Sequence, residues 1–199
     1  MNTICIFGDS TAWGAWDMKK GGWANRLWLY FAESDIDISL YNLSISGETT
    51  SGILTRFEME AKTRNADVII FQVGGNDAAK NNKNNFWVSP GDFQNNLNEI
   101  LEKAKKITDK IIFIGFNNVN ETKTLPVAWI DIYYANENIK RYNEITKSVC
   151  QKNSMPYLEI FGVLENKDLE DGLHPNNSGH QKIFEKIKNF LVDNQIINH

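Results

Sequence analysis

Cysteine and histidine are scarce in this sequence, and metal-binding spacings are absent. Only Cys5 and Cys150 occur among 199 residues, and Cys5 lies inside the apolar run 4–7. We therefore expect Cys5 to be a reduced core residue, not a disulfide partner or a ligand. The three histidines include His174 and His180, but no His-Glu-x-x-His or similar pattern accompanies them. The sequence predicts no metal site.

Positive charge and long apolar runs are also lacking. The chain carries 21 Lys and Arg against 25 Asp and Glu, a formal net charge of -4, and it has no basic stripe. This balance argues against a nucleic-acid partner. No stretch reaches the roughly 18 to 20 apolar residues of a membrane span, so we expect no membrane insertion. The first residues lack the features of a secretion signal, so we expect a cytoplasmic protein.

The sequence does contain short apolar runs that alternate with amphipathic segments, within a length that predicts one domain over residues 1–199. Runs rich in Ile, Val, Phe and Tyr predict strands at residues 4–7, 38–43, 68–73, 111–116 and 157–160. Helical periodicity predicts helices at residues 23–32, 51–62, 90–108, 131–153 and 178–194. This order predicts an α/β fold, a three-layer α/β/α sandwich around a five-stranded parallel sheet.

Residues with catalytic chemistry follow several of these strands. Ser10 follows the first strand, Gly47 the second and Asn76 the third, while Asp171 and His174 come after the fifth. In an open parallel sheet the ligand crevice lies beyond the carboxyl ends of the strands. We therefore expect these residues to meet at one edge of the sheet, although they are far apart in the sequence.

The motifs around these residues resemble those of GDSL-type esterases of the SGNH hydrolase superfamily, and the resemblance covers nearly the whole chain. In order, they are Gly8-Asp9-Ser10, residues 42–47, Gly74-Gly75-Asn76-Asp77 and Asp171-Gly172-Leu173-His174-Pro175. The second and third look most like the small bacterial acyl-esterase and thioesterase branch. Thr11 stands where the name-giving motif has leucine, which we expect to affect local packing more than chemistry. The resemblance implies a flavodoxin-like SGNH hydrolase fold.

The resemblance also implies a role for each matching residue. Ser10 would be the nucleophile, His174 the general base and acid, and Asp171 the carboxylate that orients His174. The backbone N–H groups of Ser10 and Gly47, with the side-chain amide of Asn76, would form the oxyanion hole. This machinery requires no cofactor. The expected partner is a small-molecule carboxylic ester, with thioesters and lysophospholipids as further candidates, and no pattern indicates an oligomeric state.

Two alternative functions stay open at this point: a carbohydrate O-acetylesterase and a non-catalytic small-molecule binding protein on the same scaffold. The Asn-rich segment 79–85, with the polar segment 117–125, slightly favours a small or polar ligand. Trp13 and Trp129 are candidate substrate-binding residues, although packing in the core or at its edge explains a tryptophan equally well.

Three further polar residues have simpler interpretations. We expect Asp9 and Asp77 to be structural hydrogen-bonding residues that shape their turns. His180 falls in the last predicted helix, where a packing or surface role is the simpler interpretation.

Overall fold

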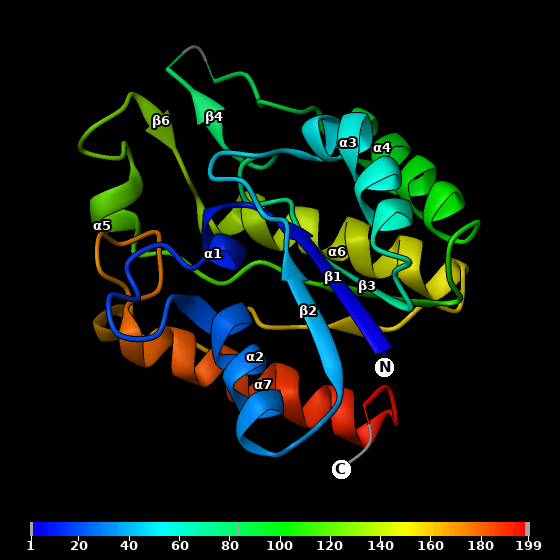
Figure 1. Cartoon of the computed structure of the whole chain (residues 1–199). Coiled ribbons are helices and arrows are strands. Elements are labelled where there is room, and N and C mark those ends of the chain that lie inside the picture. Colours follow the sequence, from blue (N-terminus) through cyan, green and yellow to red (C-terminus); the bar gives the residue numbers. More distant parts are fainter. Residues whose placement is uncertain (1, 83, 198–199) are drawn as a thin grey trace.

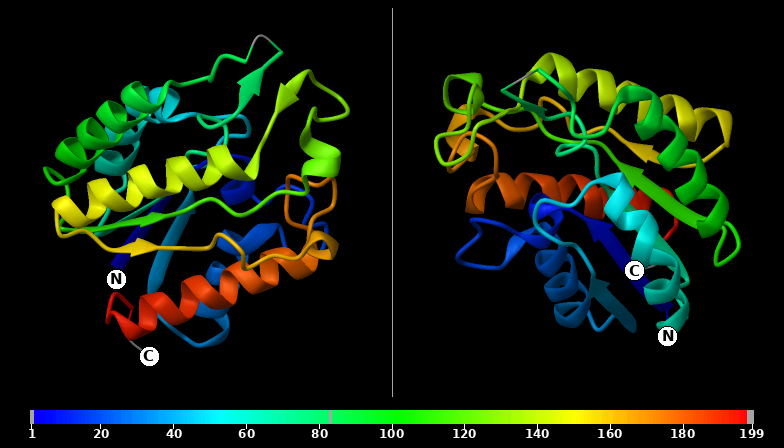
Figure 2. Two further views of the ribbon diagram at one scale, coloured as in Figure 1. Left: turned by 180° about the vertical axis from the view of Figure 1, so that it is seen from behind. Right: turned by 90° about the horizontal axis from the view of Figure 1, so that it is seen from above.

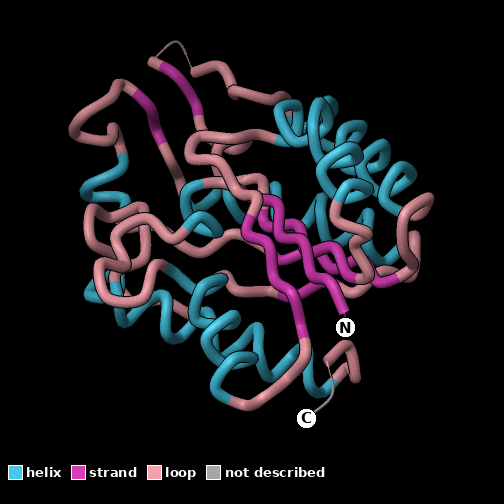
Figure 3. Tube along the Cα trace, in the orientation of Figure 1, coloured by secondary structure: helices cyan, strands magenta, loops and turns pink. Residues whose placement is uncertain are grey.

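A five-stranded parallel sheet forms the centre of the fold in the computed structural model, which describes residues 2–82 and 84–197. The strand order is β2-β1-β3-β5-β7, and every neighbouring pair is parallel (Figure 1; Figure 3). The strands are β1 (Asn2–Gly8), β2 (Ile38–Asn42), β3 (Val68–Gln72), β5 (Lys110–Ile114) and β7 (Tyr157–Leu158). The predicted fold class is confirmed, and each predicted strand is present within a few residues of its expected bounds.

Side chains of the central strands alternate between two cores, one on each face of the sheet. Phe7, Phe71 and Phe113 stand opposite one another in β1, β3 and β5, with neighbouring ring centroids 5.7 and 5.1 Å apart. Ile6 and Ile70 belong to the other core. Because both faces are covered, all residues of β3 are buried, and its sequence is nearly continuous in apolar residues instead of alternating.

Helices cover both faces of the sheet (Figure 2). On one face α4 (Pro90–Ala104) packs against α3 (Thr50–Thr63) and α6 (Asn136–Lys152), and on the other face α2 (Gly22–Glu33) packs against α7 (Asn177–Asp193). Each helix buries one apolar stripe, as an amphipathic helix on a sheet must. In α7 the buried stripe includes Ile183, Ile187 and Leu191.

The helix predicted at residues 131–153 begins later, at Asn136. The carboxylate of Glu121 accepts the backbone N–H of Asn136 at 2.7 Å and so satisfies a donor at the start of α6. The preceding residues form β6 (Ile132–Tyr133), which pairs antiparallel with β4 (Lys80–Asn81). Isoleucine and tyrosine suit a strand, and the pairing partner lies far earlier in the chain, so local periodicity carries no signal for this ribbon.

The sequence pattern also fails to predict three short helices, α1 (Ser10–Trp13), α5 (Glu121–Thr124) and the 3-10 helix η1 (Asn166–Asp168). Each is too short to show a helical repeat. In addition α4, expected to reach residue 108, ends at Ala104, whose carbonyl accepts the N–H groups of both following turn residues Ile107 and Thr108.

Both cysteines are buried and free, as predicted for Cys5. Burial raises the pKa of the Cys5 thiol to about 11, so this side chain stays protonated at neutral pH. Among the described residues, no helix is long and apolar enough to cross a membrane.

Candidate active site

Ser10 lies in a tight turn where β1 passes directly into α1. Asp9 caps this helix, because its Oδ1 accepts the N–H of Thr11 at 3.0 Å. Ser10 is the first residue of α1, so its own N–H has no intrahelical partner. The turn thus presents the Ser10 hydroxyl and a free backbone donor at the carboxyl edge of the sheet.

A chain of hydrogen bonds joins Ser10 to His174 and Asp171. Ser10 Oγ lies 2.8 Å from His174 Nε2, and His174 Nδ1 lies 2.7 Å from Asp171 Oδ2. With Nδ1 donating to the carboxylate, Nε2 is the ring nitrogen that can accept the Ser10 proton. An imidazole held in this tautomer can act as a general base toward the hydroxyl.

The carboxylate of Asp171 is held in its ionised form. Burial alone would raise the pKa of Asp171, but hydrogen bonds from the His174 ring, from the His174 backbone N–H and from the Leu173 N–H keep that pKa below its ordinary value. This tight loop depends on Gly172, which has a φ of 91° and leaves no room for a side chain, since a Cβ there would lie 2.6 Å from Lys123 Cβ.

The predicted oxyanion donors Gly47 and Asn76 lie beside Ser10 in one cavity. Gly47 has a φ of 79°, and its N–H has no acceptor within the part of the chain that the structure describes. Asn76 Nδ2 donates to the backbone carbonyl of Glu48 at 2.9 Å, and Asn76 Oδ1 accepts from the hydroxyl of Tyr134 at 2.7 Å. The amide of Asn76 is therefore held at both ends. Tyr134 lies outside the four motifs, and no sequence signal points to it.

The cavity around these residues has a volume of about 490 Å³ and mostly apolar walls. Both predicted substrate-binding residues, Trp13 and Trp129, line it, at 57% and 58% exposure. Trp16 and Trp87 also line it and are partly exposed, so tryptophans from three separate segments surround the catalytic residues. Apart from His174 and the phenol of Tyr134, no charged or titratable side chain of the described residues is among the lining.

The two polar segments expected near the ligand differ in their placement. In segment 79–85, Asn81, Asn82 and Asn84 line a separate cavity, while Lys83 lies outside the described residues. They give no support for a small or polar substrate. Segment 117–125 does contact the loop that carries Asp171 and His174, since the N–H of Asn120 donates to the carbonyl of Gly172 at 2.8 Å.

Asp9 and Asp77 of the motifs are buried, and so is His180 in α7. Asp77 accepts hydrogen bonds from the N–H and the hydroxyl of Thr50, and burial raises the pKa of Asp77 to about 6. Burial also raises the pKa of Asp9 to about 7, although its hydrogen bond from the backbone opposes this. His180 accepts the N–H of Trp23 and donates to the carbonyl of Ala15, with its pKa lowered by burial. These contacts are those of structural residues. Among the described residues, no three His, Cys, Asp or Glu side chains gather in a way that could hold a metal ion.

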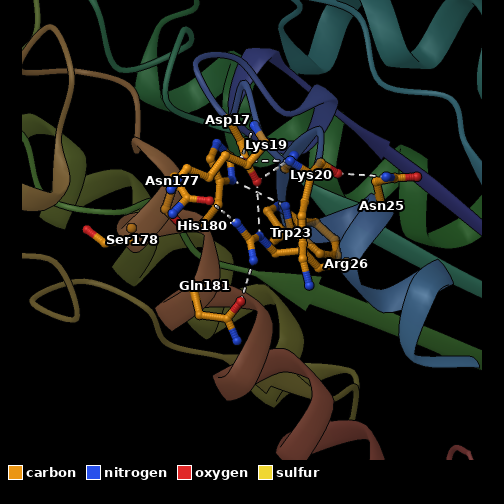
Figure 4. Close-up of polar contacts among 12 residues, drawn as sticks. Asp17, Lys19, Lys20, Trp23, Asn25, Arg26, Asn177, Ser178, His180 and Gln181 are labelled. Carbon is orange, nitrogen blue, oxygen red and sulfur yellow. Dashed lines mark hydrogen bonds and ion pairs between the residues drawn. The ribbon is translucent and has the colours of Figure 1, made fainter. Parts of the chain in front are cut away.

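A buried ion pair fixes the loop between α1 and α2, which carries the cavity residue Trp16 (Figure 4). Asp17 accepts the Nε–H of Arg26 at 2.9 Å, and it also accepts the backbone N–H groups of Lys19, Lys20 and Gly22. Arg26 extends to the start of α7 and binds Asn177 and Gln181 there. The network thus ties one wall of the cavity to the helix that follows His174.

A model of the GDSL-like lipase/acylhydrolase family matches residues 6–182. The chain belongs to this family. It is therefore a hydrolase that acts on esters, which favours a catalytic function over the binding-protein alternative.

Individual relatives agree with this membership. The esterase TesA of Pseudomonas aeruginosa is 23% identical over 189 residues, which are 93% of this chain and 85% of TesA. A crystal structure of TesA has a TM-score of 0.72 at 20% identity and covers 96% of this chain and 98% of its own. A variant of Axe2, an acetylxylan esterase from Geobacillus stearothermophilus, has a TM-score of 0.74 at 15% identity, with 96% and 92% covered. These two structures show that the fold is shared.

Proposed function

We propose that the protein is a serine esterase that forms an acyl-enzyme on Ser10, with His174 as general base and acid and Asp171 as the group that orients His174. The observation that supports this best is the continuous chain of hydrogen bonds at 2.8 and 2.7 Å from Ser10 Oγ through both ring nitrogens of His174 to Asp171. A serine hydroxyl becomes an effective nucleophile only when an adjacent base removes its proton.

In acylation, Ser10 Oγ attacks the ester carbonyl carbon while its proton passes to His174 Nε2. The bond from that carbon to the leaving-group oxygen then breaks, and His174 gives the proton to the departing alcohol. Asp171 stays ionised throughout and stabilises the imidazolium. Water repeats the sequence on the acyl-enzyme with His174 as base, which releases the acid and restores the Ser10 hydroxyl.

The negative charge on the carbonyl oxygen needs fixed donors during both steps. We assign the backbone N–H groups of Ser10 and Gly47 and the Nδ2–H of Asn76 to this role. Neutral donors that are already oriented need no reorganisation when the charge develops, and loss of one such donor typically lowers the rate by about 10² to 10³.

The walls of the cavity favour an uncharged ester with an apolar acyl group. Beyond the residues assigned to catalysis, the lining is dominated by apolar side chains from several segments, among them Val127, Ile130, Ile132 and Leu173. Such walls bind a ligand by burying apolar surface and offer few partners for polar groups.

A second candidate, a carbohydrate O-acetylesterase, rests on the tryptophans. Trp13, Trp16, Trp87 and Trp129 line the cavity while 40% to 58% exposed, and a flat ring that stays accessible can stack against a sugar. Here the acyl group would be acetyl, and the sugar would be the leaving group.

Two kinds of substrate distinguish the candidates. One is a p-nitrophenyl ester series from acetate to long acyl chains, and the other is an acetylated xylo-oligosaccharide; hydrolysis of both is measured. Ser10→Ala is measured in parallel, with the exposed Ser34→Ala as the matched control. We expect Ser10→Ala to abolish turnover and Ser34→Ala to retain it. A preference for longer acyl chains supports the apolar-acyl substrate, whereas turnover confined to the acetylated sugar supports the second candidate. Undiminished turnover by Ser10→Ala would contradict the proposed mechanism.

A further inference from the structure

Tyr134 contacts the proposed oxyanion donor Asn76 from outside the four sequence motifs. Its hydroxyl donates to Asn76 Oδ1 at 2.7 Å, it lines the catalytic cavity, and it is only 5% exposed. We propose that Tyr134 is a positioning residue for the esterase reaction, which holds the amide of Asn76 so that its Nδ2–H points to the developing oxyanion. This inference rests on the role of Asn76 in the proposed function.

The orientation of the Asn76 amide follows from its partners. The backbone carbonyl of Glu48 can only accept a hydrogen bond, so the amide end that faces it at 2.9 Å must be Nδ2. The opposite end, which faces Tyr134, is then Oδ1, and the hydroxyl must be the donor. Burial raises the pKa of the Tyr134 phenol above its ordinary value, so this donor keeps its proton at neutral pH.

These two contacts use only part of the capacity of the amide. Nδ2 has two N–H groups, and one of them is used by Glu48. The second remains for a substrate oxygen. If the hydrogen bond to Oδ1 is lost, the amide can turn about its side-chain bonds, and that second N–H loses its fixed direction. The catalytic benefit of a preorganised donor depends on that fixed direction.

Tyr134 is itself fixed by its backbone. Its N–H donates to the carbonyl of Thr124 at 3.0 Å, and its carbonyl accepts the hydroxyl of Thr124 at 2.8 Å. Thr124 is fully buried. Tyr134 directly follows β6. The pairing of β6 with β4 joins this segment to the part of the chain that follows Asn76. A rigid support of this kind is what a positioning residue requires.

The test compares Tyr134→Phe with Tyr142→Phe. Tyr142 is a matched control, because it is also buried and its hydroxyl donates to a backbone carbonyl, that of Val88, outside the catalytic cavity. With p-nitrophenyl acetate we expect Tyr134→Phe to lower kcat by about 5- to 100-fold, less than outright loss of a donor, while KM changes by no more than about twofold. Tyr142→Phe should leave kcat within about twofold of wild type, and melting temperatures report whether both variants fold.

A double-mutant cycle decides whether Tyr134 acts through Asn76. In an Asn76→Ala background, Tyr134→Phe should change kcat by less than about twofold, because the group that it positions is gone. Two results would overturn the role of Tyr134 and leave the proposed function intact. One is an equal fall in kcat in both backgrounds, and the other is a wild-type kcat for Tyr134→Phe while Ser10→Ala is inactive. Full turnover by Ser10→Ala would instead contradict the proposed function itself.

Discussion

The carboxylate of Asp171 holds both the ring and the backbone of His174. Its Oδ2 lies 2.7 Å from ring Nδ1, and its Oδ1 accepts the His174 backbone N–H at 2.8 Å. One side chain thus sets the position of the loop, the tautomer of the ring and the charge that faces it. The general base of the proposed mechanism and the carboxylate that orients it are positioned together by a single short segment.

Asp171→Asn tests this relationship. An amide in place of the carboxylate can present an N–H to Nδ1, which selects the tautomer that cannot accept the Ser10 proton. We expect kcat on a p-nitrophenyl ester to fall by about 10⁴-fold. The neighbouring, exposed Glu170→Gln removes the same charge and should retain wild-type kcat. If Asp171→Asn kept more than about a tenth of the wild-type kcat, Asp171 would not be the group that orients His174.

Asp9 should make the free energy of unfolding depend on pH. Its folded pKa of about 7 exceeds its ordinary value of 3.8, so between these values the folded state holds a proton that the unfolded state has released. Stability is therefore lost as pH rises through this range, by up to about 1.4 kcal/mol per pH unit for one group. Asp9→Asn cannot titrate. Its free energy of unfolding relative to wild type should rise from pH 4 to pH 7 and level off above, as urea unfolding can measure. A pH-independent difference would contradict this assignment.

The buried pair of Asp17 and Arg26 should be essential for stability. Asp17 and Arg26 side chains are 0% and 5% exposed, so Arg26→Leu leaves a buried carboxylate without its cation. We expect a loss of about 3 to 5 kcal/mol in the free energy of unfolding. Lys106→Leu breaks the exposed pair with Glu102 and should cost less than about 1 kcal/mol. Equal losses of unfolding free energy in the two variants would show that the buried pair contributes no more to stability than an exposed pair does.

Trp13 and Trp129 should affect substrate preference more than chemistry. Both line the catalytic cavity, whereas Trp28 is similarly exposed at 45% but lies outside it. Trp13→Ala and Trp129→Ala remove apolar wall surface, so KM should rise for the preferred ester with a smaller change in kcat, and Trp28→Ala should match wild type. The loss of one partly buried aromatic contact corresponds to about a 10-fold change in kcat/KM. Unchanged kcat/KM across the ester series would exclude a substrate-binding role for the substituted residue.

The sequence predicts the strands and the motif residues because both carry local signals. Buried parallel strands give apolar runs, and Ser10, Asp171 and His174 stand in short motifs after such runs. Tyr134 and Arg26 carry no comparable signal, since their roles come from partners far away in the sequence, Asn76 and Asn177. The sequence also gives no signal for the β4–β6 ribbon. Its two strands lie far apart in the sequence, and a strand of two residues is too short to show periodicity.

In the proposed mechanism Ser10 carries the acyl group, and rapid quenching followed by peptide mass spectrometry detects that group on the protein. Wild-type protein is mixed with a p-nitrophenyl ester in excess, quenched in acid during the first turnovers and digested. We expect an added acyl mass on the peptide that contains Ser10, and no such mass in Ser10→Ala. An acyl group on another residue in a protein that turns over the ester, or steady turnover by Ser10→Ala at the wild-type rate, would contradict the proposed mechanism.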